Sequence, residues 1–204
     1  MGKILIVGGT KGIGQEIAQL LENKECVLFS REAYSVTSNN HVHYQLDVSE
    51  GNFPDIEDIS SIVYCPGTIN LKPFRSLKVE DFQNDFDVNF LGAVKVIHHY
   101  QRNLSKAENA SIILFSTVAV KQGMNFHASI ASAKGAVEGL TRSLAAEFAG
   151  KIRVNCIAPT LTDTPLAQGI LRNEDAIKRS NERHPSKRIN TASDVAKTAE
   201  FLLQ

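Results

Sequence analysis

Tryptophan is absent from this chain, cysteine occurs only three times, and neither sign of charge is in excess, since 22 Lys and Arg balance 22 Asp and Glu. The balanced charge argues against a nucleic-acid partner and against attraction to an anionic membrane. No apolar run reaches the ~18 residues of a membrane-spanning helix, and the N-terminus opens on a strand-like run instead of a signal peptide. These absences predict a cytoplasmic protein with no nucleic-acid and no membrane partner.

The cysteines and histidines exclude two further classes. Cys26, Cys65 and Cys156 lie far apart in apolar runs, which is typical of reduced, buried thiols and not of a disulfide framework. His41 and His43 have the spacing of a metal-binding pair, but no further ligand cluster accompanies them. A strand edge is therefore the favoured interpretation of the pair, and no metal site is expected.

The most informative segment is KILIVGGTKGIG, residues 3–14. Its four consecutive branched apolar residues predict a strand that is buried on both faces of a parallel sheet. Glycines follow at once: they permit a tight turn, let the backbone approach a pyrophosphate, and let the next helix pack closely. The helix that begins here offers free N–H groups and a positive dipole end to phosphate. The segment predicts a dinucleotide-binding turn, against the alternative of a purely structural one.

Short apolar runs alternate with helical patterns along the rest of the chain. Strands are predicted at residues 4–7, 25–29, 42–46, 61–64, 111–115 and 153–157, and helices at 12–22, 79–101, 128–149 and 192–203. This alternation predicts an α/β fold, a doubly wound parallel sheet of about six strands with helices on both faces. The polar segment 31–42 is too short for a confident crossover helix and is predicted to be a loop or one helical turn. The length favours one domain.

Six motifs together resemble the short-chain dehydrogenase/reductase family, in order and over nearly the whole chain. They are GGTKGIG at 8–14, LDVS at 46–49, Asn89 in NFLGAV, LFSTVA at 114–119, Lys134 in ASAKGAVEGL, and VNCIAPTLTDTP at 154–165. The resemblance implies a Rossmann-type fold with strand order 3-2-1-4-5-6 and hydride transfer between a nicotinamide cofactor and a carbonyl or alcohol. It also implies one dinucleotide-binding domain over residues 1–204, with a short substrate-loop region near 160–190.

The resemblance carries over most of the family's cofactor contacts. Asp47 matches the aspartate that binds the adenine amine, although a cap or turn residue is the alternative, and Thr164 matches the contact to the nicotinamide carboxamide. Gly67 keeps the turn beside the adenosine ribose without the family's preceding asparagine, and Thr160 replaces a usual glycine. The implied cofactor-binding set is Gly8, Thr10, Lys11, Gly12, Ile13, Gly14, Ser30, Arg31, Asp47, Val48, Gly67, Asn89, Lys134, Pro159 and Thr164.

The end of the second predicted strand bears on the choice of cofactor. NAD-preferring relatives carry a carboxylate there that takes the ribose hydroxyls, whereas this chain has Ser30 and Arg31, with no acid before Glu32. Arg31 and Lys11 offer two cations that suit a 2′-phosphate. NADP(H) is therefore expected in preference to NAD(H), against the alternative that both cations are solvated surface charges.

The catalytic part of the resemblance is incomplete. Family members carry a tyrosine four residues before the lysine, which lowers the phenol's pKa from about 10, but here Ile130 stands at that distance from Lys134. Asn89 keeps the family's asparagine and Thr117 replaces its serine. Isoleucine cannot exchange a proton, and general acid catalysis is worth roughly 10²–10⁴-fold. His127 is a candidate replacement acid, with a capping or surface residue as the alternative.

Two functions remain open from the sequence. One is an NADP(H)-dependent oxidoreductase with an atypical active site, acting on an unknown small carbonyl or alcohol; the other is a catalytically inactive NADP(H)-binding protein that acts as a redox sensor or regulatory subunit. The sequence ends at Gln204, before the seventh strand that usually supports a second subunit interface in the family. A homodimer formed through the predicted helices at 79–101 and 128–149 is therefore expected, and not a tetramer.

Overall fold

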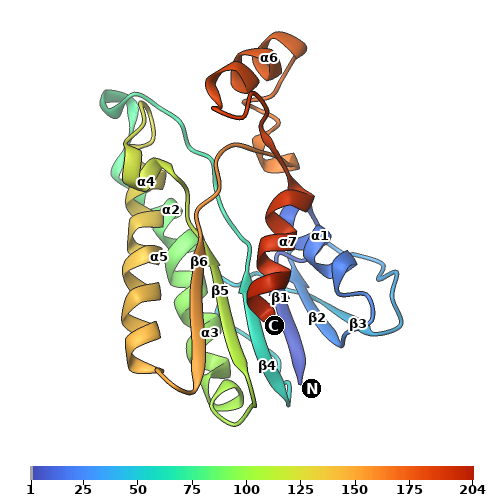
Figure 1. Ribbon diagram of the computed structural model, residues 1–204. Helices are drawn as coiled ribbons and strands as arrows, with labels where there is room; N and C mark the ends of the chain where they lie inside the picture. The colour runs from blue at the N-terminus through green and yellow to red at the C-terminus, as the bar shows by residue number, and fades with distance from the viewer. Residues whose placement is uncertain (1) are drawn as a thin grey trace.

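The centre of the computed structural model, which describes residues 2–204, is a six-stranded parallel sheet (Figure 1). Its strands lie in the order β3-β2-β1-β4-β5-β6, which confirms the order that the resemblance implied. The direction of winding reverses between β1 and β4, where a doubly wound sheet opens a crevice for ligands. The strands are β1 (Lys3–Val7), β2 (Cys26–Ser30), β3 (His41–Gln45), β4 (Ile59–Tyr64), β5 (Ala110–Phe115) and β6 (Ile152–Ile157).

Helices cover both faces of the sheet, as predicted. Figure 1 shows α1 (Gly12–Leu20) and α7 (Ala192–Leu203) on one side, with α3 (Gly92–Leu104) and α5 (Ala128–Glu147) on the other. Alternate residues of β1 enter the two cores: Ile4 and Ile6 pack on the side of α1 and α7, while Leu5 and Val7 pack with residues of α3 and α5. The apolar run at the start of the chain is therefore buried on both faces.

The single helix predicted at 79–101 is wrong in one respect, because a π-helical turn interrupts it. The segment consists of α2 (Val79–Phe86), the π turn η2 (Asp87–Leu91) and α3. The Tyr64 hydroxyl, at the end of β4, donates a hydrogen bond of 2.6 Å to the carbonyl oxygen of Val88 within this turn. A Cβ on Gly92 would collide with the same hydroxyl. Tyr64 and Gly92 thus fit the π turn to the end of β4, and the turn carries Asn89.

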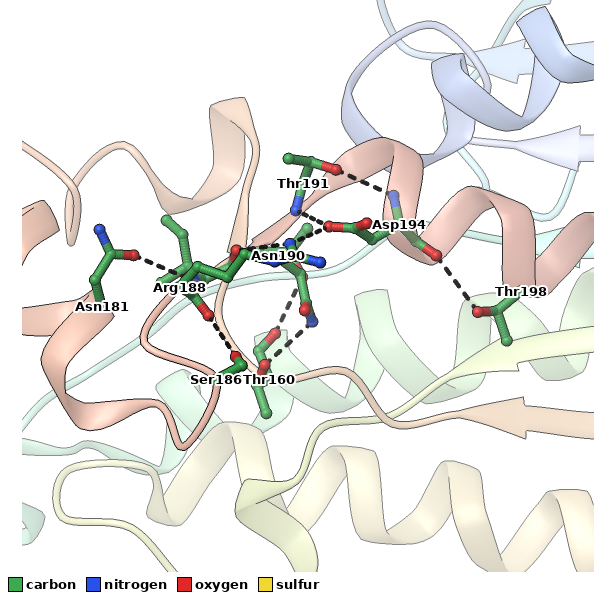
Figure 2. A network of polar contacts seen from close by, with 10 residues as sticks. Thr160, Asn181, Ser186, Arg188, Asn190, Thr191, Asp194 and Thr198 are labelled. Atoms are coloured by element: carbon green, nitrogen blue, oxygen red, sulfur yellow. Dashed lines mark hydrogen bonds and ion pairs between the residues drawn. The ribbon is translucent and has the colours of Figure 1, made fainter.

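Several short elements at the carboxyl edge of the sheet were not predicted. They are η1 (Phe74–Ser76), α4 (Ala119–Gln122), β7 (Thr162–Asp163), η3 (Pro165–Ala167), α6 (Glu174–Arg183) and β8 (Asn190–Thr191). Figure 2 shows side chains that hold the region before α7: Asn190 Nδ2 donates to Thr160 Oγ1 at 3.1 Å, and Arg188 Nη1 lies 2.7 Å from Asp194 Oδ2. Thr160 therefore replaces the family's glycine with a hydroxyl that anchors this loop. Residues 31–40 form a loop, as predicted.

The described residues also bear on membranes and metals. No helix within residues 2–204 is long and apolar enough to cross a membrane. In the same part of the chain, no three His, Cys, Asp or Glu side chains gather as a metal site. His43 Nε2 lies 2.8 Å from Ser30 Oγ, while the His41 ring lies 3.2 Å from the carbonyl oxygen of Leu21.

Candidate nucleotide and active site

The turn after β1 has the close approaches that its glycines predicted. Gly8 has a φ of 75°, and a Cβ there would lie 3.4 Å from Cys65 Cβ. A Cβ on Gly14 would collide with the carbonyl oxygen of Gly8, so only glycine lets α1 start this close to the strand. No side chain caps the N-terminus of α1 at Lys11, which leaves its first N–H groups open to an anion.

Gly12 connects this turn to the loop after β6. Its φ is 54°, and a Cβ at this position would lie 3.4 Å from the Cβ of Thr164 and 3.6 Å from the Cδ of Pro165. The residue predicted to contact the nicotinamide therefore packs directly on the turn predicted to hold the phosphates. Residues more than 150 positions apart meet here because both follow the carboxyl ends of parallel strands.

The end of β2 differs from the sequence interpretation in one respect. Lys11 Nζ lies 2.6 Å from Glu32 Oε2, with 59% and 72% of the two side chains exposed. The ammonium of Lys11 and its hydrogen bond also hold the pKa of the Glu32 carboxyl below its usual value. Lys11 is therefore paired with an acid that the sequence analysis had set aside. Arg31 is exposed, and the Gln45 side chain donates to its carbonyl oxygen at 3.1 Å.

Asp47 makes a hydrogen bond within its own turn. Its Oδ1 accepts a 2.8 Å hydrogen bond from the backbone N–H of Ser49, and this bond is the main cause of a lowered Asp47 pKa. The neighbouring Val48 packs against the core beneath α3. Both residues lie just beyond β3, at the carboxyl edge of the sheet.

The Asn89 and Lys134 side chains converge on Gly67. A Cβ on Gly67 would lie 3.3 Å from Asn89 Oδ1 and 3.6 Å from Lys134 Nζ. Asn89 is 1% exposed and Lys134 is 8% exposed. Burial lowers the pKa of the Lys134 ammonium to about 8, against the opposing influence of Cys156, Cys65 and Asp85. A Cβ at Gly67 would also lie 3.8 Å from Leu166 Cδ2, so a side chain there would crowd both polar groups.

Three residues of this cluster were missed by the sequence analysis. Asp85 is fully buried: its Oδ1 accepts from Thr68 Oγ1 at 2.6 Å, and its Oδ2 accepts from Ser129 Oγ. Asn89 Nδ2 donates at 2.8 Å both to Thr68 Oγ1 and to the carbonyl oxygen of Asp85. The spacing of Asp85 four residues before Asn89 was the available signal, because it places both on one helix face.

The other two catalytic candidates have different surroundings. Thr117 Oγ1 accepts a 3.3 Å hydrogen bond from the backbone N–H of Ala119 and borders a cavity of about 470 Å³ beside β6. His127 Nδ1 donates to the carbonyl oxygen of Asn125 at 2.7 Å and borders a separate cavity of about 580 Å³. Of the described residues, neither Asn89 nor Lys134 borders either cavity. Ile130 is buried, with 6% of its surface exposed.

Comparison with protein families gives one decisive match. A family model described as enoyl-(acyl carrier protein) reductase matches residues 33–204. The chain belongs to the short-chain dehydrogenase/reductase family. Carbonyl reductase family member 4 of Danio rerio, a similar member of this oxidoreductase family, is 30% identical over 100% of this chain and 92% of its own length. A tropinone reductase homolog of Arabidopsis thaliana is 29% identical over 97% of this chain and 84% of its own.

Solved structures of other short-chain dehydrogenases/reductases have the same fold as this chain. A short chain dehydrogenase family protein from Francisella tularensis has a TM-score of 0.90 at 23% identity, over 100% of this chain and 91% of that one. The structure of ElxO with NADP bound has a TM-score of 0.88 at 27% identity, covering 100% of this chain and 92% of that chain. The sheet order and the positions of the covering helices are therefore those of the family.

Proposed function

We propose that this protein is an NADP(H)-dependent oxidoreductase that acts on a small carbonyl or alcohol substrate through an atypical active site. The observation that carries the proposal is the convergence of Asn89 Oδ1 and Lys134 Nζ on Gly67. Both groups are buried, so an amide acceptor and an ammonium donor lie together beside Gly67 in the turn after β4. The bound NADP of ElxO and the reductase relatives support the same assignment.

The residues at the crevice fit a nicotinamide dinucleotide. The glycine turn and the open N–H groups of α1 would hold the pyrophosphate, because a Cβ would obstruct the backbone there. Lys134 would donate to the ribose hydroxyls, and Arg31 would bind a 2′-phosphate with Lys11 once Glu32 releases it. The other proposed contacts come from Thr10, Ile13, Ser30, Asp47, Val48, Gly67, Pro159 and Thr164.

When bound, the nicotinamide supplies or accepts the hydride. This chain binds and orients the reactants, but the side chain that stands at the family's tyrosine, Ile130, cannot give a proton to the substrate oxygen. Thr117 and Asn89 can position polar groups without replacing that acid. We therefore propose slow turnover of ordinary aldehydes and ketones, since the missing acid is worth roughly 10²–10⁴-fold.

An NADPH-oxidation assay with a panel of aldehydes and ketones tests this function. We expect slow oxidation by the unmutated protein, none above background with Lys134→Met, and a rate raised roughly 10²-fold by Ile130→Tyr on at least one carbonyl that the pocket admits. Ordinary enzymatic rates in the unmutated protein would contradict the atypical site. His127→Ala would then test His127 as the donor: a large rate loss would support it, and an unchanged rate would exclude it.

A second function is favoured by the buried Ile130 side chain. Nucleotide binding without turnover, in both the unmutated protein and Ile130→Tyr, would identify a catalytically inactive NADP(H)-binding protein, a redox sensor or regulatory subunit.

In either case we propose a cytoplasmic homodimer that pairs through α3 and α5. Free thiols at Cys26, Cys65 and Cys156 support a reducing compartment. The pairing rests on the resemblance to the family, and a Cβ on Gly139 of α5 would meet no atom of its own subunit within 4 Å.

A further inference from the structure

The fully buried Asp85 is not used by the chemistry described so far. Its carboxylate lies on α2, between the loop after β4 and the start of α5, and each oxygen accepts a hydrogen bond from a hydroxyl group. Burying a charge without compensation is costly, so a carboxylate at this place has a compensating environment. That environment consists of Thr68, Ser129 and, through electrostatic attraction, Lys134.

We propose that Asp85 is a positioning residue, which as an ionised carboxylate fixes the direction of the hydrogen bonds to Asn89 and serves as the counter-charge of Lys134. The proposal deepens the proposed function, because Asn89 and Lys134 are the groups assigned there to the reactants. Asp85 itself acts through these two residues.

The direction of the hydrogen bonds follows from the number of protons available. An ionised carboxylate only accepts, so the Thr68 hydroxyl must donate its single proton to Asp85 Oδ1. Thr68 Oγ1 is then an acceptor, and it receives its hydrogen bond from Asn89 Nδ2. The same amide nitrogen also donates to the carbonyl oxygen of Asp85. The Asn89 amide therefore has one allowed orientation.

This orientation leaves a buried acceptor free. Asn89 Oδ1 is the one buried side-chain nitrogen or oxygen atom that lacks a hydrogen-bond partner within residues 2–204. It lies on the same side as Lys134 Nζ, as both atoms lie near a Cβ position on Gly67. An unpartnered buried acceptor is unfavourable, which indicates that a donor occupies this place in the working protein. A protonated Asp85 could donate to Thr68 Oγ1, and the Thr68 hydroxyl could then donate to the Asn89 side chain.

The charge argument uses the groups around Lys134. Cys156 on β6, Cys65 directly after β4, and Asp85 on α2 act on its ammonium. Burial raises the pKa of the Cys65 thiol to about 12 and also raises that of Cys156, so both thiols stay neutral near pH 8. Asp85 is then the negative charge among these three groups that favours the ammonium form of Lys134.

The test measures the ionisation of both residues in the protein without nucleotide. Carbon-13 NMR of the Asp85 carboxyl reports its ionisation, and NMR of labelled lysine Cε follows the titration of Lys134, assigned with Lys134→Arg. We expect an ionised Asp85 at pH 7 and a lower Lys134 pKa in Asp85→Asn than in the unmutated protein. The control Asp87→Asn removes an exposed charge two residues away and leaves that titration unchanged.

A protonated Asp85 at pH 7 in the unmutated protein would overturn the proposal even if Asp85→Asn does not fold. So would a Lys134 titration in folded Asp85→Asn that equals the one in Asp87→Asn. Thr68→Val removes the hydroxyl that connects Asp85 to Asn89 and keeps the Asp85 carboxylate. We expect this variant to have an unchanged Lys134 titration and an NADPH affinity about five-fold weaker. An unchanged NADPH affinity of Thr68→Val would refute the role of the hydrogen bonds from Asn89 through Thr68 to Asp85. Failure of both NADPH and NADH to bind the unmutated protein would instead refute the proposed function, since the NMR results need no nucleotide.

Discussion

At the residue scale, the carboxylate of Glu32 forms an ion pair with the ammonium of Lys11, which we propose as a ligand of the 2′-phosphate. We expect Glu32→Gln to tighten NADPH binding by about two- to five-fold at low ionic strength, because the exposed ion pair no longer competes. NADH, which lacks the 2′-phosphate, should gain less. Fluorescence titration measures both affinities, with Glu22→Gln as the control at an exposed site. A loss of NADH affinity without a gain for NADPH would show instead that Glu32 binds ribose hydroxyls.

Lys134 gives a second prediction, on stability. Burial lowers its pKa from 10.5 to about 8. The unfolded chain therefore binds this proton more tightly, and the resulting loss of stability is complete below pH 8 and disappears above pH 10.5. Because Lys134→Met alone would leave the buried Asp85 carboxylate without its counter-charge, the comparison is made in the Asp85→Asn background. There Lys134→Met should raise the free energy of unfolding by on the order of 1–3 kcal/mol at pH 7, with a smaller gain at pH 10.

Urea unfolding at the two pH values measures this difference, and NADPH titration of the same variant should show lost binding. A double variant less stable than Asp85→Asn at pH 7 would contradict the account of a buried ammonium. The matched control is Lys121→Met, which removes an exposed ammonium and should change stability little at either pH.

The residues that the sequence could identify lie in local motifs, whereas those that it could not identify make contacts between distant positions of the chain. The glycines, Asn89 and Lys134 lie in local motifs, so their neighbourhood at the carboxyl edge could be predicted. The pairing of Lys11 with Glu32 spans 21 positions and that of Ser129 with Asp85 spans 44, so each depends on how the elements pack. Asp85 was missed because an acid in a helical pattern ordinarily indicates a solvent-exposed face.

At the scale of elements, hydrophobic periodicity predicted every strand of the large sheet and the helices α1, α5 and α7 with small differences in their ends. Local periodicity could not show the π turn, because its contacts come from Tyr64 on another strand. It also missed α6, β7 and β8. That region is polar, and the side-chain bonds around Asn190 and Asp194 help to hold it (Figure 2).

The π turn gives a prediction on stability. Gly92→Ala should lower the free energy of unfolding by about 1–3 kcal/mol, because its Cβ collides with the Tyr64 hydroxyl. The control Gly135→Ala meets only Val120 Cγ1 at 3.7 Å and should be neutral or stabilising by up to about 1 kcal/mol. In a double-mutant cycle, Tyr64→Phe should reduce the loss caused by Gly92→Ala. Equal stability of the two alanine variants would contradict the role of this contact.

At the scale of the whole molecule, pairing through α3 and α5 predicts a dimer mass in light scattering. Gly139→Arg should shift that mass to the monomer without unfolding the chain, since the side chain has open space within one subunit but would enter the interface. Gly169→Arg is the control, because Gly169 also has open space and lies outside both helices. A monomer or tetramer mass for the unmutated protein would contradict the proposed assembly.

The central claim is that the carboxyl edge between β1 and β4 binds a nicotinamide dinucleotide and prefers the one with a 2′-phosphate. Calorimetric titration of the unmutated protein with NADPH and with NADH, at the same pH and salt concentration, tests it most directly. The account predicts one site per chain, with NADPH bound about ten-fold more tightly than NADH and a smaller difference in Arg31→Ala. Equal affinities for the two nucleotides would contradict the preference, and binding of neither would contradict the site itself.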